Sequence, residues 1–439
     1  MSGPGAERPE RGSGQREQDA ERPERGSGRR EQRAERPERG SGQGEQGAER
    51  PERRAWSGPP SAERREVTIV AQHVGPVGGM ERVLTELALG LRRRGYAVNV
   101  VAYGCDLPAA SGVVFHRVRG PSRPFVLGYP WFVLVGSLVL RRRRRGIVLC
   151  TGAIVLNEVD LVGVHYCQQV GPATPKRKTL PFRLNAALSG LIGRVGERIC
   201  FALEDPRWFV CVSEGVAEEI RTFYPRFADR TVVIPNGVDT AAFAPGSRSQ
   251  DAAALRERLG IAPGRLVAIF VGSEWDRKGL EPAIRALRGA GAWDLLVVGD
   301  GEREHYEAIA RAEGVQDAVR WAGVSRDVAP FYELADALVF PTAYEAFPLV
   351  ALEAAASGLP ILATAVNGVR ELVHDGVEGF LIERDPEAIR RRLRELGADP
   401  GLRERMGAAA REAALRYSWE QMVARHDELY SSLRAEGRG

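Results

Sequence analysis

The chain has 439 residues, enough for two ordinary domains and an additional segment. Its composition, 44% hydrophobic and 27% charged, is ordinary for a soluble globular protein, and a net charge of only +4 gives no support to nucleic-acid binding. The five cysteines lack the spacing of zinc or redox motifs, and the polar N-terminus lacks the apolar run of a signal peptide. We therefore expect reduced thiols and a cytoplasmic protein.

The first sixty residues form a low-complexity repeat. A unit that begins AERPERGSG starts at Ala6, Ala20 and Ala34, and it restarts in shortened form at Ala48. Because the repeat contains almost no apolar side chains, it cannot bury enough surface to offset the entropy of ordering. The pattern predicts a disordered tail over residues 1–63. A docking arm, or a translated repeat upstream of the true start, remains an open alternative.

From Glu66 onward, short apolar strands alternate with helices. The strand Val67–Ala71 is followed by a glycine-bearing loop and by an amphipathic helix at Met80–Arg94. The later strands and one further helix are expected at Val98–Ala102, Trp208–Val212, Glu214–Phe223 (helix), Thr231–Ile234, Leu266–Val271, Leu295–Val298, Ala337–Phe340 and Pro360–Ala363. This α/β alternation predicts two doubly wound, Rossmann-like domains, 64–235 and 236–415, that face a cleft. Ligands of such folds bind at the carboxyl ends of strands.

An apolar stretch, Phe125–Leu140, is followed directly by five arginines, Arg141–Arg145. Its sixteen residues include Pro130 and fall short of the about 20 that a membrane span requires. Two interpretations remain open. One is a buried or half-buried helix with a solvated basic end. The other is an apolar face with a polybasic end that rests on anionic lipid, which makes Phe125–Arg145 a candidate membrane contact.

Two cations follow the predicted strand Leu266–Val271. In the segment GSEWDRKG, Arg277 and Lys278 lie in the loop at the carboxyl end of that strand. Opposite a helix N-terminus, two such cations can bind a pyrophosphate and stabilise the charge that develops as it leaves.

The most informative segment, EAFPLVALEAAASGLP, follows the strand Ala337–Phe340. Pro348 stands where a helix begins, and the exposed amides of residues 347–350 at its N-terminus predict a phosphate site. Glu353 falls in the first turns, where its carboxylate can accept hydrogen bonds from a ribose diol. A pair of glutamates, Glu345 and Glu353, is also typical of glycosidases, but a loop followed by a helix puts both on one side of the ligand, which disfavours that mechanism.

Eight short motifs then occur in one order along residues 66–430. They are GGMERV from Gly78, VGVHYC around His165, VSEGV from Val212, IPNGVD from Ile234, VGSEWDRKG from Val271, VVGDGE from Val297, EAFPLVALEAAASGLP from Glu345 and SWEQMVARHDELY from Ser418. In these motifs the chain resembles the retaining glycosyltransferases of family 4, which have the GT-B fold of two Rossmann-like domains. The resemblance implies that residues 416–439 contain a helix that crosses back to the first domain.

The resemblance also implies the reaction and its donor site. A sugar would pass from a nucleoside diphosphate sugar to an acceptor hydroxyl with retention, without a metal or a cofactor. Glu353 would hold the ribose hydroxyls, and Glu345 would contact the donor sugar near the reacting carbon. The remaining phosphate contacts would come from Arg277 and Lys278 on one side and, on the other, from the backbone amides of Phe347, Leu349 and Val350, which flank Pro348 and would bind the distal phosphate.

Further positions follow from the same resemblance. Gly78 and Gly79 would bring the backbone close to the donor phosphate or the acceptor, and His165 would lie over the donor sugar. Backbone groups near Val324 would contact the base. Ser273 stands where many members have an arginine, so Arg277 would have to take over that work. Ala346 stands where many members have glycine.

The residues leave the substrates and some alternatives open. The acceptor could be a glycoconjugate, a lipid-linked molecule or a natural product, and neither the base nor the sugar of the donor is predicted. Another enzyme of similar architecture, such as a nucleotide-sugar epimerase or a sugar phosphorylase, and a non-catalytic sugar-nucleotide-binding protein are the alternatives. We expect a location in the cytoplasm, with the inner face of the membrane as a further possibility.

Overall fold

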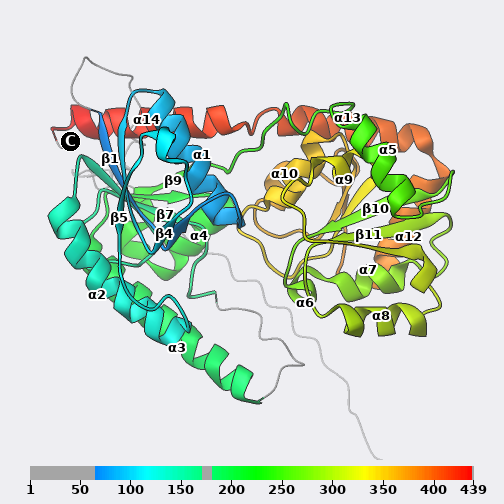
Figure 1. Ribbon diagram of the computed structural model, residues 1–439, viewed down its shortest axis with the longest axis horizontal. Coiled ribbons are helices and arrows are strands. Elements are labelled where there is room, and N and C mark those ends of the chain that lie inside the picture. Colours follow the sequence, from blue (N-terminus) through cyan, green and yellow to red (C-terminus); the bar gives the residue numbers. More distant parts are fainter. Residues whose placement is uncertain (1–64, 171–179, 438–439) are drawn as a thin grey trace, which may run out of the picture. The chain divides into compact units, whose positions relative to one another are not determined.

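The computed structural model describes residues 65–170 and 180–437, so the predicted tail at 1–63 lies outside the described residues. These residues fall within one unit of the chain, 56–439, which contains two large parallel sheets, one in each half of the unit (Figure 1).

The first sheet has seven parallel strands in the order β5-β3-β1-β6-β7-β8-β9. They are β1 Glu66–Val70, β3 Ala97–Ala102, β5 Val114–Arg117, β6 Ile147–Thr151, β7 Leu161–Val164, β8 Trp208–Cys211 and β9 Thr231–Val233. Two short strands, β2 His73–Val74 and β4 Gly104–Cys105, pair with each other beside it. The strand order reverses between β1 and β6, which is the point where an open α/β sheet leaves a crevice for ligands.

The second sheet repeats this arrangement with six parallel strands in the order β12-β11-β10-β13-β14-β15. They are β10 Leu266–Val271, β11 Trp293–Val298, β12 Val319–Gly323, β13 Ala337–Phe340, β14 Ile361–Ala363 and β15 Gly379–Leu381. Here the order reverses between β10 and β13. The two segments with predicted phosphate-binding residues follow these two strands.

Helices cover both faces of each sheet. In the first half they are α1 Gly79–Arg93, α2 Phe125–Arg143, α3 Leu180–Glu204 and α4 Glu214–Phe223, with 3-10 turns η1 Ala109–Ser111 and η2 Pro225–Arg230. In the second half they are α5 Ser249–Arg258, α6 Trp275–Lys278, α7 Leu280–Ala286, α8 Arg303–Ala312, η3 Gln316–Ala318, α9 Ala329–Glu333, α10 Leu349–Ala356, α11 Val369–Leu372, α12 Pro386–Ala398 and α13 Pro400–Ala414. The last helix in the sequence is α14 Trp419–Ala435.

Alternating side chains of the strands divide the core into layers. Val67 and Ile69 of β1 pack into the cluster that contains residues of α1 and α14, whereas Val70 packs on the other face with α2 and α3. The central strands of both large sheets are buried along nearly their whole length, as expected of parallel sheets, whereas the edge strands β5, β9 and β12 are partly exposed. The predicted fold class is therefore confirmed, and most predicted bounds agree with the structure to within one or two residues.

The last helix, α14, lies against the first half of the unit although it follows the second half in sequence (Figure 1). Gly90 of α1 contacts Val423 so closely that a side chain at Gly90 would clash with it. Tyr96 donates a hydrogen bond to Asp427 at 2.6 Å and packs edge-on against Tyr430. The C-terminal helix thus joins the two halves.

The apolar stretch that begins at Phe125 forms α2, a 19-residue helix that is long and apolar enough to cross a membrane by length and composition. In the structure its Tyr129, Phe132 and Leu140 are buried in the core under the first sheet. The sequence interpretation of a half-buried helix is therefore correct for one side of α2. Its opposite side is exposed.

Candidate active site

A pocket lies between the two halves, at the carboxyl ends of the strands. Its lining from the first half includes Gly79, Met80, His165, Tyr166, Gln168 and Asn236, and its lining from the second half includes Ser273, Glu274, Arg277, Lys278 and residues 344–350. The structure thus gathers most of the predicted site residues at one place. It is the place where the two strand-order reversals predict a ligand.

Arg277 and Lys278 lie in α6, a single helical turn after β10, where the sequence predicted a loop. Gly272 and Gly279 flank this turn with φ of 129° and 85°, values that favour glycine. A side chain at Gly272 would meet the Lys278 Cε at 2.8 Å, so the lysine lies directly over the glycine backbone. The Lys278 ammonium also lies 4.8 Å from the centre of the Phe340 ring. The glycines therefore bring both cations close to the strand ends.

Glu345, in the loop after β13, pairs with both cations. Its Oε1 accepts hydrogen bonds from Arg277 Nη1 at 2.9 Å and from Lys278 Nζ at 3.4 Å. Thr342 donates to the same oxygen at 3.3 Å. The side chains of Lys278 and Glu345 are only 12% and 14% exposed, so these charges interact in a partly desolvated place. Arg277 Nη2 also donates to Oε2 of Glu274 at 2.9 Å, so two cations and two carboxylates form this cluster, and a bound anion would compete with the carboxylates for the cations.

The N-terminus of α10 lines the same pocket. Pro348 is its N-cap residue, in an extended conformation and without a side-chain cap. Ala351 and Leu352 donate to the carbonyl of Pro348, but the amides of Leu349 and Val350 have no hydrogen-bond acceptor among the described residues. These amides and the helix dipole provide a second group that attracts an anion.

Glu353 is buried and does not line the pocket. Its Oε1 accepts a hydrogen bond from Arg82 Nη1 at 2.7 Å, and its Oε2 accepts one from the Tyr332 hydroxyl at 3.1 Å. Burial raises the pKa of this carboxyl, and the nearby Arg82 guanidinium opposes that rise. The sequence did not predict either partner. Arg82 belongs to the GGMERV motif, which was a usable signal, whereas nothing in the sequence pointed to Tyr332.

His165 directly follows β7 and lines the pocket from the first half. Burial, together with the nearby His426, lowers its pKa to about 4. The imidazole is therefore neutral at neutral pH, and it can donate or accept a hydrogen bond without bringing a positive charge.

The remaining predicted residues differ in position. Gly78 precedes α1 with φ of 101°, and a side chain there would clash with the Glu81 carboxylate. Gly79 lines the pocket, and a side chain there would meet no atom within 4 Å. Ser273 also lines the pocket. Val324 is 75% exposed and is not part of the lining.

Two polar atoms in the pocket wall were missed by the sequence interpretation. The hydroxyl of Tyr166 and the Oδ1 of Asn236 are buried without a hydrogen-bond partner among the described residues. Asn236 Nδ2 donates to the carbonyl of Phe347 at 3.0 Å, which fixes the direction of its free oxygen. Buried polar atoms without a partner are rare, so both are candidates for ligand contacts.

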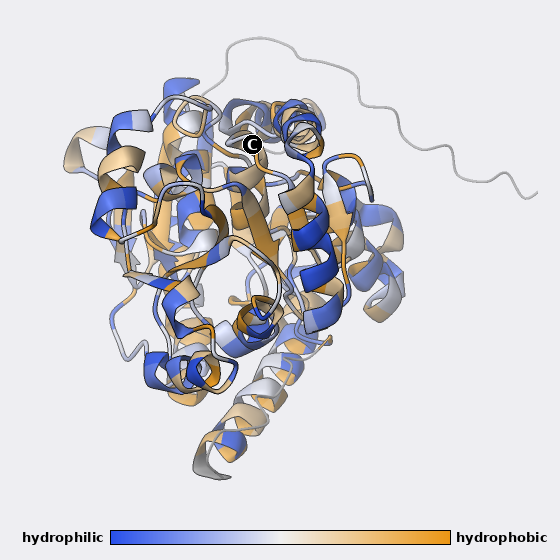
Figure 2. Cartoon of the chain, turned by 90° about the vertical axis from the view of Figure 1, so that its right-hand side faces the viewer, coloured by the Kyte–Doolittle hydropathy of each residue, from blue (hydrophilic) through white to orange (hydrophobic). Residues whose placement is uncertain are grey.

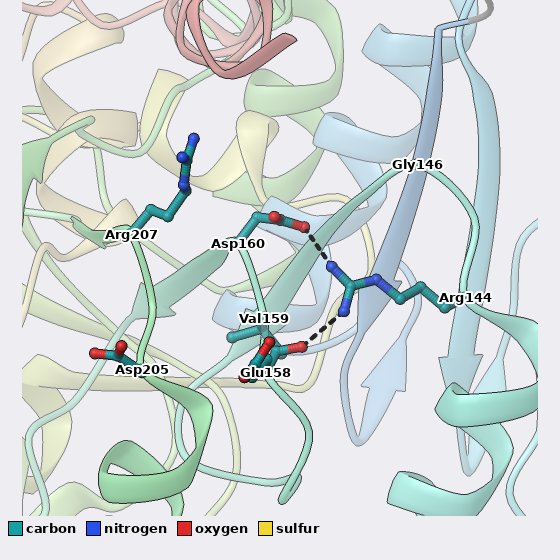
Figure 3. A pocket seen from close by; sticks show the side chains of 7 residues that line it. All are labelled: Arg144, Gly146, Glu158, Val159, Asp160, Asp205 and Arg207. Carbon is teal, nitrogen blue, oxygen red and sulfur yellow. Dashed lines mark hydrogen bonds and ion pairs between the residues drawn. The ribbon is translucent and has the colours of Figure 1, made fainter. Parts of the chain in front are cut away.

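A second hollow lies at the opposite, amino ends of β6, β7 and β8 (Figure 3). In it, Arg144 donates to the carbonyl of Glu158 at 3.0 Å and to Asp160 Oδ2 at 3.2 Å. Asp160 Oδ2 also accepts from the amide of Val148 at 2.8 Å. These groups pair their hydrogen-bond donors and acceptors with one another and so hold the strand ends together. None of the predicted site residues lines this hollow.

Comparisons with known proteins agree with this geometry. The family model described as Glycosyltransferase Family 4 matches residues 77–242, and the model described as Glycosyl transferases group 1 matches residues 251–413. A D-inositol 3-phosphate glycosyltransferase from Xylanimonas cellulosilytica is 36% identical over 392 residues, which are 81% of this chain and 92% of that protein. One from Geodermatophilus obscurus is 33% identical over 425 residues, which are 82% and 87% of the two chains.

Solved structures show the same fold. The sucrose-phosphate synthase of Thermosynechococcus elongatus superposes with a TM-score of 0.70 at 21% identity, covering 85% of this chain and 100% of that chain. Anabaena HepE in complex with UDP and glucose gives a TM-score of 0.67 at 20% identity, covering 84% and 100%. From its two matched family models and its relatives, the chain belongs to glycosyltransferase family 4 and is a glycosyltransferase of the GT-B fold.

Proposed function

We propose that this glycosyltransferase transfers a sugar from a nucleoside diphosphate sugar to an acceptor hydroxyl, with retention of configuration at the anomeric carbon. The main support is the convergence of Arg277, Lys278 and the N-terminus of α10 on one pocket. Cations and free amides together suit a diphosphate, which is the leaving group of such a donor.

In this proposal the diphosphate lies between the two cations and the amides of Leu349 and Val350. As the bond to the sugar breaks, negative charge grows on the phosphate oxygen, and these fixed donors stabilise it without reorganisation. Glu345 keeps Arg277 and Lys278 oriented in the empty protein, and it faces the donor sugar when the diphosphate is bound.

His165 and Glu353 have positioning roles in the proposal. A neutral His165 makes a hydrogen bond to a sugar hydroxyl and does not act as a charged acid at neutral pH. Arg82 and Tyr332 hold the buried Glu353 behind the pocket lining, so its proposed contact with the ribose requires neighbouring side chains to move aside when the donor binds.

Retention follows if the acceptor oxygen approaches the face that the diphosphate leaves and the leaving phosphate takes up the acceptor proton. The bond between the anomeric carbon and the phosphate oxygen breaks, and the new glycosidic bond to the acceptor oxygen forms. The proton of the acceptor hydroxyl leaves on the nucleoside diphosphate. The anomeric configuration of an isolated product, measured by NMR, tests this directly. An inverted product would overturn the mechanism.

We propose further that neither a divalent ion nor a cofactor takes part. Among residues 65–170 and 180–437 no group of three or more His, Cys, Asp or Glu side chains gathers in a way that suits a metal ion. Arg277 and Lys278 supply the positive charge that a metal would otherwise provide. Unchanged turnover in EDTA is the expected result, and loss of turnover that Mg²⁺ or Mn²⁺ restores would contradict it.

The five cysteines are free thiols in the structure, which supports our inference of a reducing, cytoplasmic location. Cell fractionation tests it: the protein should appear in the cytoplasmic or inner-membrane fraction.

A thermal-shift screen identifies the donor. UDP-, GDP-, ADP- and TDP-sugars are compared, because a ligand that binds only the folded state raises the melting temperature by an amount that grows with the logarithm of its concentration divided by its dissociation constant. The names of the relatives make inositol 3-phosphate the first acceptor to test with the donor so found.

Conversion of donor without an acceptor would favour an epimerase, and pyridoxal phosphate absorbance would favour a phosphorylase. Binding without turnover on any acceptor would favour a non-catalytic protein.

A further inference from the structure

Helix α3 carries an exposed apolar stripe. Leu184, Leu188, Leu191, Val195 and Ile199 recur at intervals of three or four residues, which places them on one side of the helix. Each is between 48% and 63% exposed, and Leu203 continues the stripe at 51%. The side of α3 with Cys200 and Phe201 is buried in the core. The stripe therefore points away from the sheet.

Helix α2 carries a second stripe of the same kind. Leu127, Trp131, Leu134 and Leu138 are between 44% and 61% exposed and again recur every three or four residues. The two helices together hold eleven of the nineteen large hydrophobic side chains that are exposed among the described residues. Scattered single exposed leucines are normal, but such a concentration marks an interaction surface.

The two stripes share one side of the molecule. Helices α2 and α3 pack against each other beneath the same face of the first sheet, with Gly196 of α3 against the Tyr129 ring (Figure 1). In the hydropathy colouring of Figure 2, α3 is the lowest helix, with apolar and polar residues both visible along it. The outward sides of α2 and α3 are called the α2–α3 face below.

The charges at this face are positive. Helix α2 contains no acidic residue, and the two in α3, Glu197 and Glu204, are buried. The last turn of α2 presents Arg141–Arg143, which are exposed and have no ion-pair partner among the described residues. Arg183 and Arg198 of α3 are exposed as well. A surface of leucines flanked by arginines matches an anionic bilayer, whereas two copies of it would bring like charges together.

We propose that the α2–α3 face docks on an anionic lipid membrane. Within Arg141–Arg145, Arg144 donates hydrogen bonds to the Glu158 carbonyl and the Asp160 carboxylate and is therefore not free to bind lipid. In this proposal Arg141–Arg143 supply the charge that faces the lipid. Phe125 of α2 and Ser189 and Gly190 of α3 also line the pocket, so docking presents the mouth of the pocket to the bilayer. Residues 1–63 contain thirteen arginines and thirteen acidic residues, so the tail adds no net charge.

The test is co-sedimentation of the full chain with lipid vesicles. We expect binding to vesicles with about 30% phosphatidylglycerol, weak binding to phosphatidylcholine alone, and loss of binding in high salt. The variant R141Q/R142Q/R143Q should bind about a hundredfold more weakly, since each basic residue near an anionic surface contributes roughly fivefold. The matched control R258Q/R391Q/R416Q removes three exposed arginines of the second half and should bind as the unchanged protein does.

A second variant tests the apolar part. L188E/V195E changes two residues that are 49% and 48% exposed, so it should fold normally and lose vesicle binding. Its control, V377E/L415E, changes residues of similar exposure, 50% and 47%, in the second half. Equal binding to both vesicle types, full binding by either test variant, or a dimer in solution that L188E/V195E dissociates would overturn the proposal. Nucleotide thermal shifts on the same samples test the proposed function separately.

Discussion

The loops of the second half and the α2–α3 face of the first half use opposite chemistry. Around Lys278 and Glu345, a few charged side chains and free amides lie at strand ends, mostly shielded from water. On α2 and α3, two exposed stripes of large apolar side chains, mostly leucine, lie beside exposed arginines. We propose that the first arrangement binds a small anion by local geometry. The second needs an extended partner, because no single residue in it forms a site.

The largest effect should come from the loop after β10. Lys278→Ala removes one of the two cations placed to stabilise the leaving diphosphate, and we expect kcat to fall about 10²- to 10³-fold, as for loss of one transition-state donor. Vesicle binding should not change, which separates the two regions. Arg311→Ala, at a side chain that is 62% exposed, is the control. Full turnover in Lys278→Ala would show that the cluster has no part in the reaction.

The pH dependence of stability should reveal the buried histidines. Burial lowers the pKa of both His165 and His426 to about 4, below the ordinary value of 6.5. Between these values the unfolded chain binds more protons than the folded chain, so the free energy of unfolding falls as the pH drops from about 6.5 to 4. Buried His426 should contribute up to about 3 kcal/mol of this loss, from 1.36 kcal/mol per pKa unit.

Urea unfolding of His426→Asn measures that contribution. The variant should lose less stability over this pH range than the unchanged protein. His374→Asn, at a side chain that is 65% exposed, should behave like the unchanged protein. Identical slopes for all three proteins would mean that His426 binds its proton equally well in the folded and unfolded states, which would contradict a lowered pKa.

The ion pair between Arg82 and Glu353 connects the two halves of the unit, since Arg82 lies on α1 and Glu353 on α10. We expect Glu353→Gln to weaken nucleotide binding about tenfold, because a charge-assisted hydrogen bond to the ribose becomes a neutral one. Tyr332→Phe removes only the neighbouring hydroxyl and should have a smaller effect. Calorimetric titration with the best nucleotide compares them. If Glu353→Gln binds the nucleotide as tightly as the unchanged protein, Glu353 has no part in nucleotide binding and only joins the two halves.

The smallest effects should distinguish two adjacent glycines. Gly78→Ala places a side chain at φ of 101°, and we expect a loss of about 1 kcal/mol in the free energy of unfolding. Gly79→Ala faces open space in the pocket, so it should leave stability unchanged and weaken donor binding. Denaturant titrations and nucleotide thermal shifts of the two variants check this, and equal behaviour of the two would contradict it.

The contrast also explains which features the sequence could predict. The helix Leu349–Ala356 and the cations of GSEWDRKG follow from short segments whose local chemistry determines their structure, and both have the predicted bounds or position. The partner of Glu353 could not be predicted this way, because Arg82 lies 271 residues away. The roles assigned to these residues by resemblance stay predictions.

The α3 stripe shows a different limit. A spacing of three or four residues predicts an apolar helix face, but it does not predict whether another element covers that face. Val324 is exposed and lies outside the pocket lining, and the predicted contact of its backbone with the base stays a prediction.

The central claim is that Arg277, Lys278 and the N-terminus of α10 together bind a diphosphate. Calorimetric titration of a nucleoside diphosphate and the matching monophosphate, with the unchanged protein and with Lys278→Ala, tests it most directly. The account predicts that the diphosphate binds at least about tenfold more tightly and that this preference shrinks markedly in the variant. Equal affinities for the two nucleotides in the unchanged protein would contradict it.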